Sequence, residues 1–232
     1  YGLIRFGVEL FPGYVTDLAF FIGVLGVVNI LYGAVLAFVQ TDLKRVIAYS
    51  SISHMGIILL GIAALNVTGL QGAVFQMVSH GFISALLFFF IAALTERTGT
   101  TLIPELGGLA KSAPVLCGIF LAAGMATLGL PGMSGFISEF LAFLGIFETQ
   151  PVLGVLGVLG MILAALYMLR AVLGTTFGPA KGRWPSLKDT RPAEAVPMLV
   201  LLGFIILIGV YPAVLNDPLY VTLESIVARM GG

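Results

Sequence analysis

An apolar stretch of more than thirty residues, from Ala113 to Phe147, contains a helix breaker in its middle and a carboxylate shortly after it. A continuous helix of that length would be about 50 Å long, whereas the hydrocarbon core of a bilayer is about 30 Å thick. We therefore expect two shorter helices joined by a break at Pro131 and Gly132. Non-helical backbone at membrane depth is tolerated only inside protein or beside a water-filled cavity. Glu139, just beyond the break, is accordingly predicted to lie on a path for ions.

The composition indicates an integral membrane protein and excludes several classes of function. Apolar residues make up 59% of the chain and charged residues 9%, whereas soluble domains carry about 25% charged residues. Basic and acidic residues number 11 each, so the chain has no positive footprint for nucleic acid, and no such partner is expected. The one cysteine, Cys117, lies in an apolar run, which predicts no disulfide and no metal site. We also find no motif for a redox cofactor and no residues typical of an enzyme active site.

Six segments are long and apolar enough to cross a bilayer as helices, and none alternates as barrel strands do. The sequence therefore predicts an all-α, polytopic membrane protein in which one of about six transmembrane helices is broken. Thr16 and Asp17 are the predicted N-cap of the first segment. The predicted spans are residues 18–39, 46–65, 71–94, 113–147, 152–177 and 196–215.

The polar turns between these spans differ in charge from one side of the predicted bundle to the other. The turns after the first, third and fifth spans are basic, whereas the opposite turns are mainly acidic. The positive-inside rule places the basic turns in the cytoplasm and the C-terminus on the outer face of the membrane. The basic residues of these turns are Lys44, Arg45, Arg97, Lys111, Lys181, Arg183, Lys188 and Arg191.

Three ionisable side chains, His54, His80 and Glu139, are expected at a similar depth in three different spans. Such a set suits a proton relay, because each group accepts and releases protons. The alternative is that each histidine is a neutral hydrogen-bonding bridge between helices, which fits a lone histidine better than two beside a broken helix. Auxiliary roles on the path are expected for Lys44, as a candidate inner proton donor, and for Ser50, Ser51 and Ser84.

Three motifs that include these residues resemble signatures of a known family. The segments Asp42–Gly56 (DLKRVIAYSSISHMG), Gln76–Gly81 (QMVSHG) and Leu128–Phe140 (LGLPGMSGFISEF) resemble the antiporter-like membrane subunits of respiratory complex I, the NADH:quinone oxidoreductase. The resemblance covers essentially the whole chain, with the motifs in the family's order. Glu139 indicates the subunit type called M in bacteria, equivalent to chain 4 of the mitochondrial enzyme, because the L and N types and the sodium/proton antiporters usually carry lysine there.

The resemblance implies a subunit of fourteen transmembrane helices with two inverted five-helix repeats, each containing a broken helix. This chain would correspond to the second repeat and the last helix. His54 and His80 match histidines of the family's central axis, and Glu139 matches the acid from which protons exit. The implied regions are 1–13, the end of a preceding truncated helix; 14–177, the second repeat; 178–195, a cytoplasmic loop; and 196–232, the last helix and a tail.

The activity that the resemblance implies is proton translocation coupled to quinone reduction elsewhere in a larger complex. The expected location is a bacterial cytoplasmic (inner) membrane, with the lipid bilayer and the other membrane-arm subunits as partners. NADH, FMN, iron–sulfur clusters and quinone are implied for the complex, and none of them is expected to bind this chain. Two alternatives remain open. One is a subunit of a multi-subunit sodium/proton antiporter or of a membrane-bound hydrogenase, and the other is a structural spacer of a membrane arm.

Overall fold

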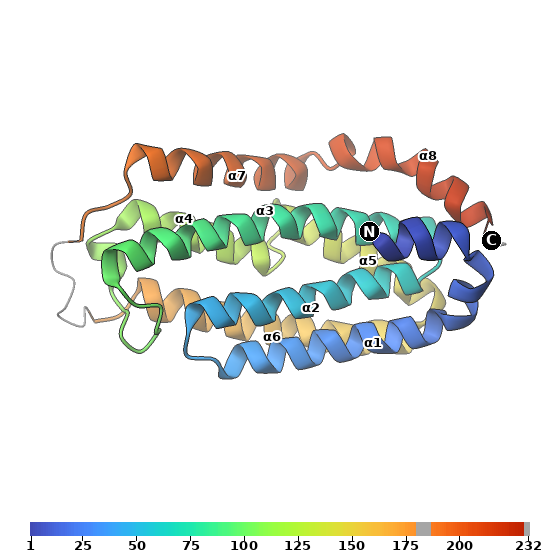
Figure 1. Ribbon diagram of the computed structural model, residues 1–232, viewed down its shortest axis with the longest axis horizontal. Coiled ribbons are helices and arrows are strands. Elements are labelled where there is room, and N and C mark those ends of the chain that lie inside the picture. Colours follow the sequence, from blue (N-terminus) through green and yellow to red (C-terminus); the bar gives the residue numbers. More distant parts are fainter. Residues whose placement is uncertain (180–186, 230–232) are drawn as a thin grey trace.

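The computed structural model describes residues 1–179 and 187–229 of the 232-residue chain. Helices make up the regular structure of these residues and lie along one long axis (Figure 1). Five helices, α1, α2, α3, α6 and α7, are long and apolar enough to cross a membrane. Their bounds are α1 Pro12–Val39, α2 Leu43–Ala63, α3 Val67–Thr98, α6 Pro151–Thr176 and α7 Pro192–Val210.

Two shorter helices, α4 (Pro114–Thr127) and α5 (Ser134–Thr149), follow one another along the chain and form the two halves of the predicted broken span. The remaining elements are a π-helical segment η1 (Leu3–Val8), a short 3-10 turn η2 (Leu109–Lys111) and a final helix α8 (Ala213–Arg229). The predicted all-α membrane fold with one broken helix is therefore confirmed.

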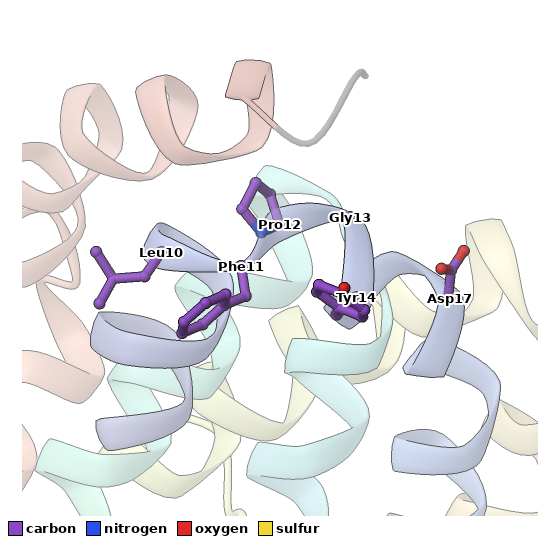
Figure 2. Close-up of a pocket in the computed structure, with 6 residues that line it drawn as sticks. All are labelled: Leu10, Phe11, Pro12, Gly13, Tyr14 and Asp17. Atoms are coloured by element: carbon purple, nitrogen blue, oxygen red, sulfur yellow. The ribbon is translucent and has the colours of Figure 1, made fainter.

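The first transmembrane helix begins earlier than the sequence analysis predicted. Proline is favoured in the first turn of a helix, where its missing N–H is not needed, and α1 begins at Pro12. Thr16 is therefore not an N-cap but lies inside the helix, where its hydroxyl donates to the Pro12 carbonyl at 3.0 Å. Around this start, Leu10, Phe11 and Tyr14 line an open surface hollow (Figure 2).

The turns predicted to be basic lie together at one end of the bundle. The α1–α2 turn, the segment between α3 and α4 and the segment before α7 meet at the end opposite both chain termini (Figure 1). Two of these turns pair directly: the Leu43 N–H donates to the Thr101 carbonyl at 2.9 Å, and the Ile103 N–H donates to the Thr41 carbonyl at 2.8 Å. Lys181 and Arg183 lie outside the described residues.

A distant carboxylate caps the start of α4. The first N–H groups of a helix have no partner within it, and at α4 Asp189 accepts from Val115 at 2.8 Å and from Leu116 at 3.1 Å. Desolvation acts to raise the pKa of Asp189, but these bonds and those from Thr190 outweigh it and hold the pKa below its ordinary value. The same segment is fixed to α3 by Arg97, which donates to the Asp189 carbonyl at 3.2 Å.

The last transmembrane helix begins within the segment expected to be a loop. α7 starts at Pro192, and the Glu194 carboxylate accepts from the Arg191 N–H at 3.0 Å, which satisfies one free donor at the helix start. α7 ends at Val210, and the tail that follows forms the helix α8.

Small residues allow the helices that carry the buried polar groups to pack closely, as is typical of membrane proteins. On α3, a Cβ at Gly72 would lie 2.6 Å from the Ala142 Cα of α5. On α1, a Cβ at Gly26 would lie 2.9 Å from the Gly56 carbonyl of α2. Because real Cβ atoms do not approach other atoms so closely, glycine is required at both contacts.

Candidate functional site

The break between α4 and α5 is formed by glycines in a conformation that other residues rarely adopt. Gly129 has φ +67° and Gly132 has φ +92°, and they flank Pro131. Both angles lie in the left-handed region, which costs glycine little. The predicted break at Pro131 and Gly132 is therefore present. At the end of α4 the Met125 and Ala126 carbonyls accept from the Leu130 and Gly129 N–H groups instead of from a continuing helix.

The Glu139 carboxyl lies against this break and beside His54. Its Oε1 atom is 3.7 Å from His54 Nδ1, and both side chains are buried. Its Oε2 atom would be 2.8 Å from a Cβ placed on Gly129. Among the described residues, no hydrogen bond to the Glu139 carboxyl is found. The structure thus brings one predicted histidine and the predicted carboxylate together, with the carboxylate free to take up a hydrogen bond.

A glutamine connects His54 to the helix that carries Glu139. The Gln76 side-chain nitrogen on α3 lies 3.2 Å from His54 Nδ1 on α2, and the Gln76 side-chain oxygen accepts from the Ser138 hydroxyl of α5. Because the Gln76 amide donates to Nδ1, that nitrogen carries no proton in this arrangement, and the ring proton resides on Nε2. A proton on Nδ1 therefore requires His54 to give up its bond to Gln76.

The second histidine is near the first but has different partners. His80 on α3 is half-buried, and its ring centroid lies 5.6 Å from that of His54. Its Nε2 atom lies 3.1 Å from the Ser51 hydroxyl and 3.1 Å from the Ser84 hydroxyl. The structure thus places Ser51 and Ser84, two of the predicted auxiliary residues, in direct contact with His80.

A small cavity joins these groups. It has about 10 Å³ of space for the centre of a water molecule, which corresponds to roughly one bound water. Five polar side chains in its wall, those of His54, Gln76, His80, Thr127 and Glu139, can hydrogen-bond such a water. The two histidines and the carboxylate, predicted separately at similar depth, therefore line one small cavity at the helix break.

The other predicted auxiliary residues lie outside this cavity. Ser50 is buried, but its hydroxyl donates to the Ile47 carbonyl at 2.8 Å on its own helix. Lys44 is exposed at the basic end of the bundle, and its backbone N–H is bonded to the Asp42 side chain at 2.8 Å, the N-cap bond of α2. Its predicted role as an inner proton donor stays a prediction.

Three polar groups at the site were not singled out by the sequence analysis. Gln76 was named only as the first residue of a motif, although its position one turn before His80 is a local signal. Ser138 precedes Glu139, and Ser134 lies one turn before it, 2.7 Å from the Ser79 hydroxyl of α3. Within residues 1–179 and 187–229, no group of three histidine, cysteine or acidic residues is arranged to hold a metal ion.

A broken helix in a membrane bundle, with two histidines and a buried carboxylate near the break, is the arrangement expected from the resemblance to antiporter-like membrane subunits. The comparison with known families agrees with this class. Residues 1–169 match the family described as "NADH:quinone oxidoreductase/Mrp antiporter, TM", and the chain belongs to this family. The predicted resemblance to the antiporter-like subunits of complex I is thereby confirmed.

Among curated relatives, the chain is 44% identical to NAD(P)H-quinone oxidoreductase chain 4 1 of Synechococcus elongatus, over 99% of this chain and 44% of the relative. It is also 44% identical to chain 4 2 of Thermosynechococcus vestitus, over 100% of this chain and 45% of the relative. The chain thus spans a little under half the length of these relatives. Both names agree with the chain 4 type predicted from Glu139.

Solved structures show the same architecture. A chain of the respiratory complex I from Thermus thermophilus with bound NADH superimposes with a TM-score of 0.94 at 34% identity, covering 100% of this chain and 49% of that one. A chain of the Mrp complex from Dietzia sp. gives a TM-score of 0.84 at 22% identity, covering 98% of this chain and 52% of that one. At that identity the Mrp likeness shows the fold alone.

Proposed function

We propose that this chain translocates protons as part of the membrane arm of a quinone oxidoreductase of the complex I type. The observation that carries the proposal is the contact between His54 and Glu139 at the helix break, beside a cavity with room for about one water. Buried ionisable side chains inside a membrane are costly and typically mark ion pathways. The names of the relatives support the oxidoreductase as the setting.

The geometry supports an order for the proton transfers. A proton on His80 passes to His54 through a water in the shared cavity, because both rings line it. For this, His54 gives up its bond from Gln76, so that Nδ1 can take the proton, and the proton then moves from that nitrogen to the Glu139 carboxyl oxygen, which lies 3.7 Å from Nδ1 in the structure. The ring N–H bond breaks and a carboxyl O–H bond forms, after which Glu139 releases the proton beyond the break. The hydrogen bond from Gln76 therefore controls when His54 receives a proton.

The wider assembly belongs to the same proposal. Other membrane-arm subunits and the bilayer surround the chain, and NADH, FMN, iron–sulfur clusters and quinone act in the rest of the complex, with no redox step on this chain. The basic end faces the cytoplasm of a bacterium, and the C-terminus lies on the outer face, because positive charges favour the cytoplasmic side. In this proposal, helices α1 to α6, with α4 and α5 as one broken span, form a five-helix antiporter-like repeat.

Proton pumping by the assembled complex in proteoliposomes tests the function. In the Glu139→Gln variant the side chain keeps its size but carries no transferable proton, so most proton translocation per NADH oxidised should be lost while the complex still assembles. Glu224→Gln, an exposed glutamate on α8, is the matched control and should pump normally. Full pumping by the Glu139→Gln complex would refute the proposal.

The same vesicles distinguish the alternatives. A sodium/proton antiporter subunit predicts that transport responds to sodium, whereas proton pumping by a quinone oxidoreductase should not change when sodium is replaced by another monovalent cation. A structural spacer predicts that substitution of His54 and His80 together leaves transport unchanged. The two relatives with 44% identity carry the quinone oxidoreductase name, which is why this function is preferred.

A further inference from the structure

A serine beside Glu139 lies between two hydrogen-bond acceptors. The Ser138 side chain on α5 is fully buried. Its hydroxyl donates to the Gln76 side-chain oxygen of α3, and the same hydroxyl lies 2.9 Å from the Gly135 carbonyl, one turn earlier on α5. A serine hydroxyl carries one proton, so the two acceptors compete for it. The Ser138 proton can therefore point across to Gln76 or back along its own helix.

The position of this proton determines how the Gln76 amide can face. When Ser138 donates to Gln76, the amide oxygen faces α5 and the amide nitrogen faces His54 Nδ1, 3.2 Å away. When Ser138 donates to the Gly135 carbonyl instead, its oxygen is free to accept from the amide nitrogen. The amide oxygen then faces His54. Because the amide oxygen and nitrogen are nearly equal in size, this reversal is a half-turn of the amide group and requires no movement of a helix.

The two orientations of Gln76 suit different states of His54. In the first, the amide donates to Nδ1, so that nitrogen holds no proton. In the second, the amide oxygen can only accept, so Nδ1 must carry a proton to be paired. Nδ1 is also the nitrogen that lies 3.7 Å from Glu139 Oε1. The second orientation therefore fits His54 while it holds the proton for Glu139, and the first fits His54 after that proton has left.

Burial makes the wrong orientation costly. Gln76 is 2% exposed and His54 is 6% exposed, so bulk water does not replace a hydrogen bond that is lost between them. A protonated Nδ1 against the amide nitrogen would place two donors together, and an unprotonated Nδ1 against the amide oxygen would place two acceptors together. Gln76 and His54 thus change state together, and Ser138 is able to pair with Gln76 in both orientations.

We propose that Ser138 is a positioning residue that opposes return of the proton to His54. While Nδ1 holds the proton, Ser138 donates to the Gly135 carbonyl and the Gln76 oxygen accepts from Nδ1. Once the proton has moved to Glu139, Ser138 donates to the Gln76 oxygen again, and the amide nitrogen donates to Nδ1, which slows return of the proton. Only hydrogen bonds of Ser138 and Gln76 change, and none of their covalent bonds breaks. This inference rests on the proposed function, and it names the groups that give the transfer its direction.

A purely structural role of Ser138 makes a different prediction. If Ser138 only ties α5 to α3, its removal lowers stability, and the neutral His54 ring keeps its proton on Nε2. If Ser138 sets the Gln76 amide, replacement by alanine allows both amide orientations, because either one then lacks its partner on α5. The neutral His54 ring should then carry its proton on Nε2 in some molecules and on Nδ1 in others.

The experiment compares Ser138→Ala with Ser53→Ala in the assembled complex. Ser53 is another buried serine, on α2, and its hydroxyl donates to the Ile30 carbonyl of α1 at 3.1 Å, away from Gln76. Infrared difference spectra with isotope-labelled histidine distinguish the two ring tautomers, and the His54 band is identified by its absence in His54→Gln. We expect the Nε2 tautomer alone in Ser53→Ala and both tautomers in Ser138→Ala.

Proton translocation is the second readout. We expect net translocation about fivefold slower in Ser138→Ala, from the loss of one hydrogen bond, and a normal rate in Ser53→Ala. A His54 ring that stays in the Nε2 tautomer in Ser138→Ala overturns the proposal whatever the rate, and so does normal translocation by that variant. The proposed function fails separately, through full pumping by Glu139→Gln. If Glu139→Gln is inactive while Ser138→Ala resembles Ser53→Ala, the proton path stands and the role of Ser138 is wrong.

Discussion

Adding one methyl group to α3 should separate the two helices that carry the site. Gly72 packs against the backbone of α5, and a Cβ there would lie 2.6 Å from the Ala142 Cα and 2.7 Å from the Leu141 carbonyl carbon. Gly72→Ala therefore requires α5 to move by about 1 Å to restore ordinary van der Waals contact. Since the opposing atoms are backbone, no side-chain rotation relieves the clash.

The expected loss of stability follows from two terms. Overpacking a close helix contact costs about 1–3 kcal/mol. The displacement also weakens two hydrogen bonds between α3 and α5, Gln76 to Ser138 and Ser79 to Ser134, each contributing about 0.6 kcal/mol between membrane helices. The free energy of unfolding should thus fall by about 2–4 kcal/mol. Proton transfer should fall as well, because the same movement draws Glu139 away from His54.

Equilibrium unfolding in mixed detergent micelles measures the first effect, and proton pumping by the assembled complex measures the second. Gly81→Ala is the matched control, because a Cβ at Gly81, on the same helix, meets no atom within 4 Å. We expect Gly81→Ala to be close to the unsubstituted protein in both assays. If Gly72→Ala equals Gly81→Ala in stability and in pumping, the close contact of α3 with α5 is refuted.

Two further substitutions test the start of the broken span and the break in its middle. Asp189→Ala removes the cap of α4 and should cost about 0.5–2 kcal/mol at neutral pH. Because the pKa of Asp189 is held low in the folded state, the unsubstituted protein loses the stabilisation from the cap as the pH falls below about 3.9. The difference in free energy of unfolding between it and Asp189→Ala should therefore shrink on acidification. A difference that stays constant would contradict the cap. On α7, a Cβ at Gly209 would lie 2.6 Å from the Gly132 carbonyl oxygen at the break, whereas one at Gly203 meets no atom within 4 Å. Gly209→Ala should therefore reduce proton pumping and Gly203→Ala should not, and equal pumping by both would show that α7 does not hold the break.

Much of the fold was determined by the sequence alone. Long apolar segments with few charges can satisfy their backbone in a bilayer only as helices, so the class of fold followed from composition and length. The break was equally local, because Pro131 removes a helical hydrogen bond and Gly132 adopts a φ that other residues avoid. Charge in the turns predicted which ends of the helices lie together. The N-cap at Thr16 was wrong because Pro12, four residues earlier, starts the helix more effectively.

Only the tertiary structure decided how the polar residues meet. Spacing along a helix gives the depth of His54 and Glu139, but their contact depends on how α2 and α5 pack against α3. The close contact at Gly72 fixes α3 against α5. The bridge from Gln76 to His54 joins residues of different helices, and Asp189 caps a helix 73 residues away. The apolar periodicity of the sequence does not predict such contacts, because each depends on how two segments pack together and not on the sequence of either one.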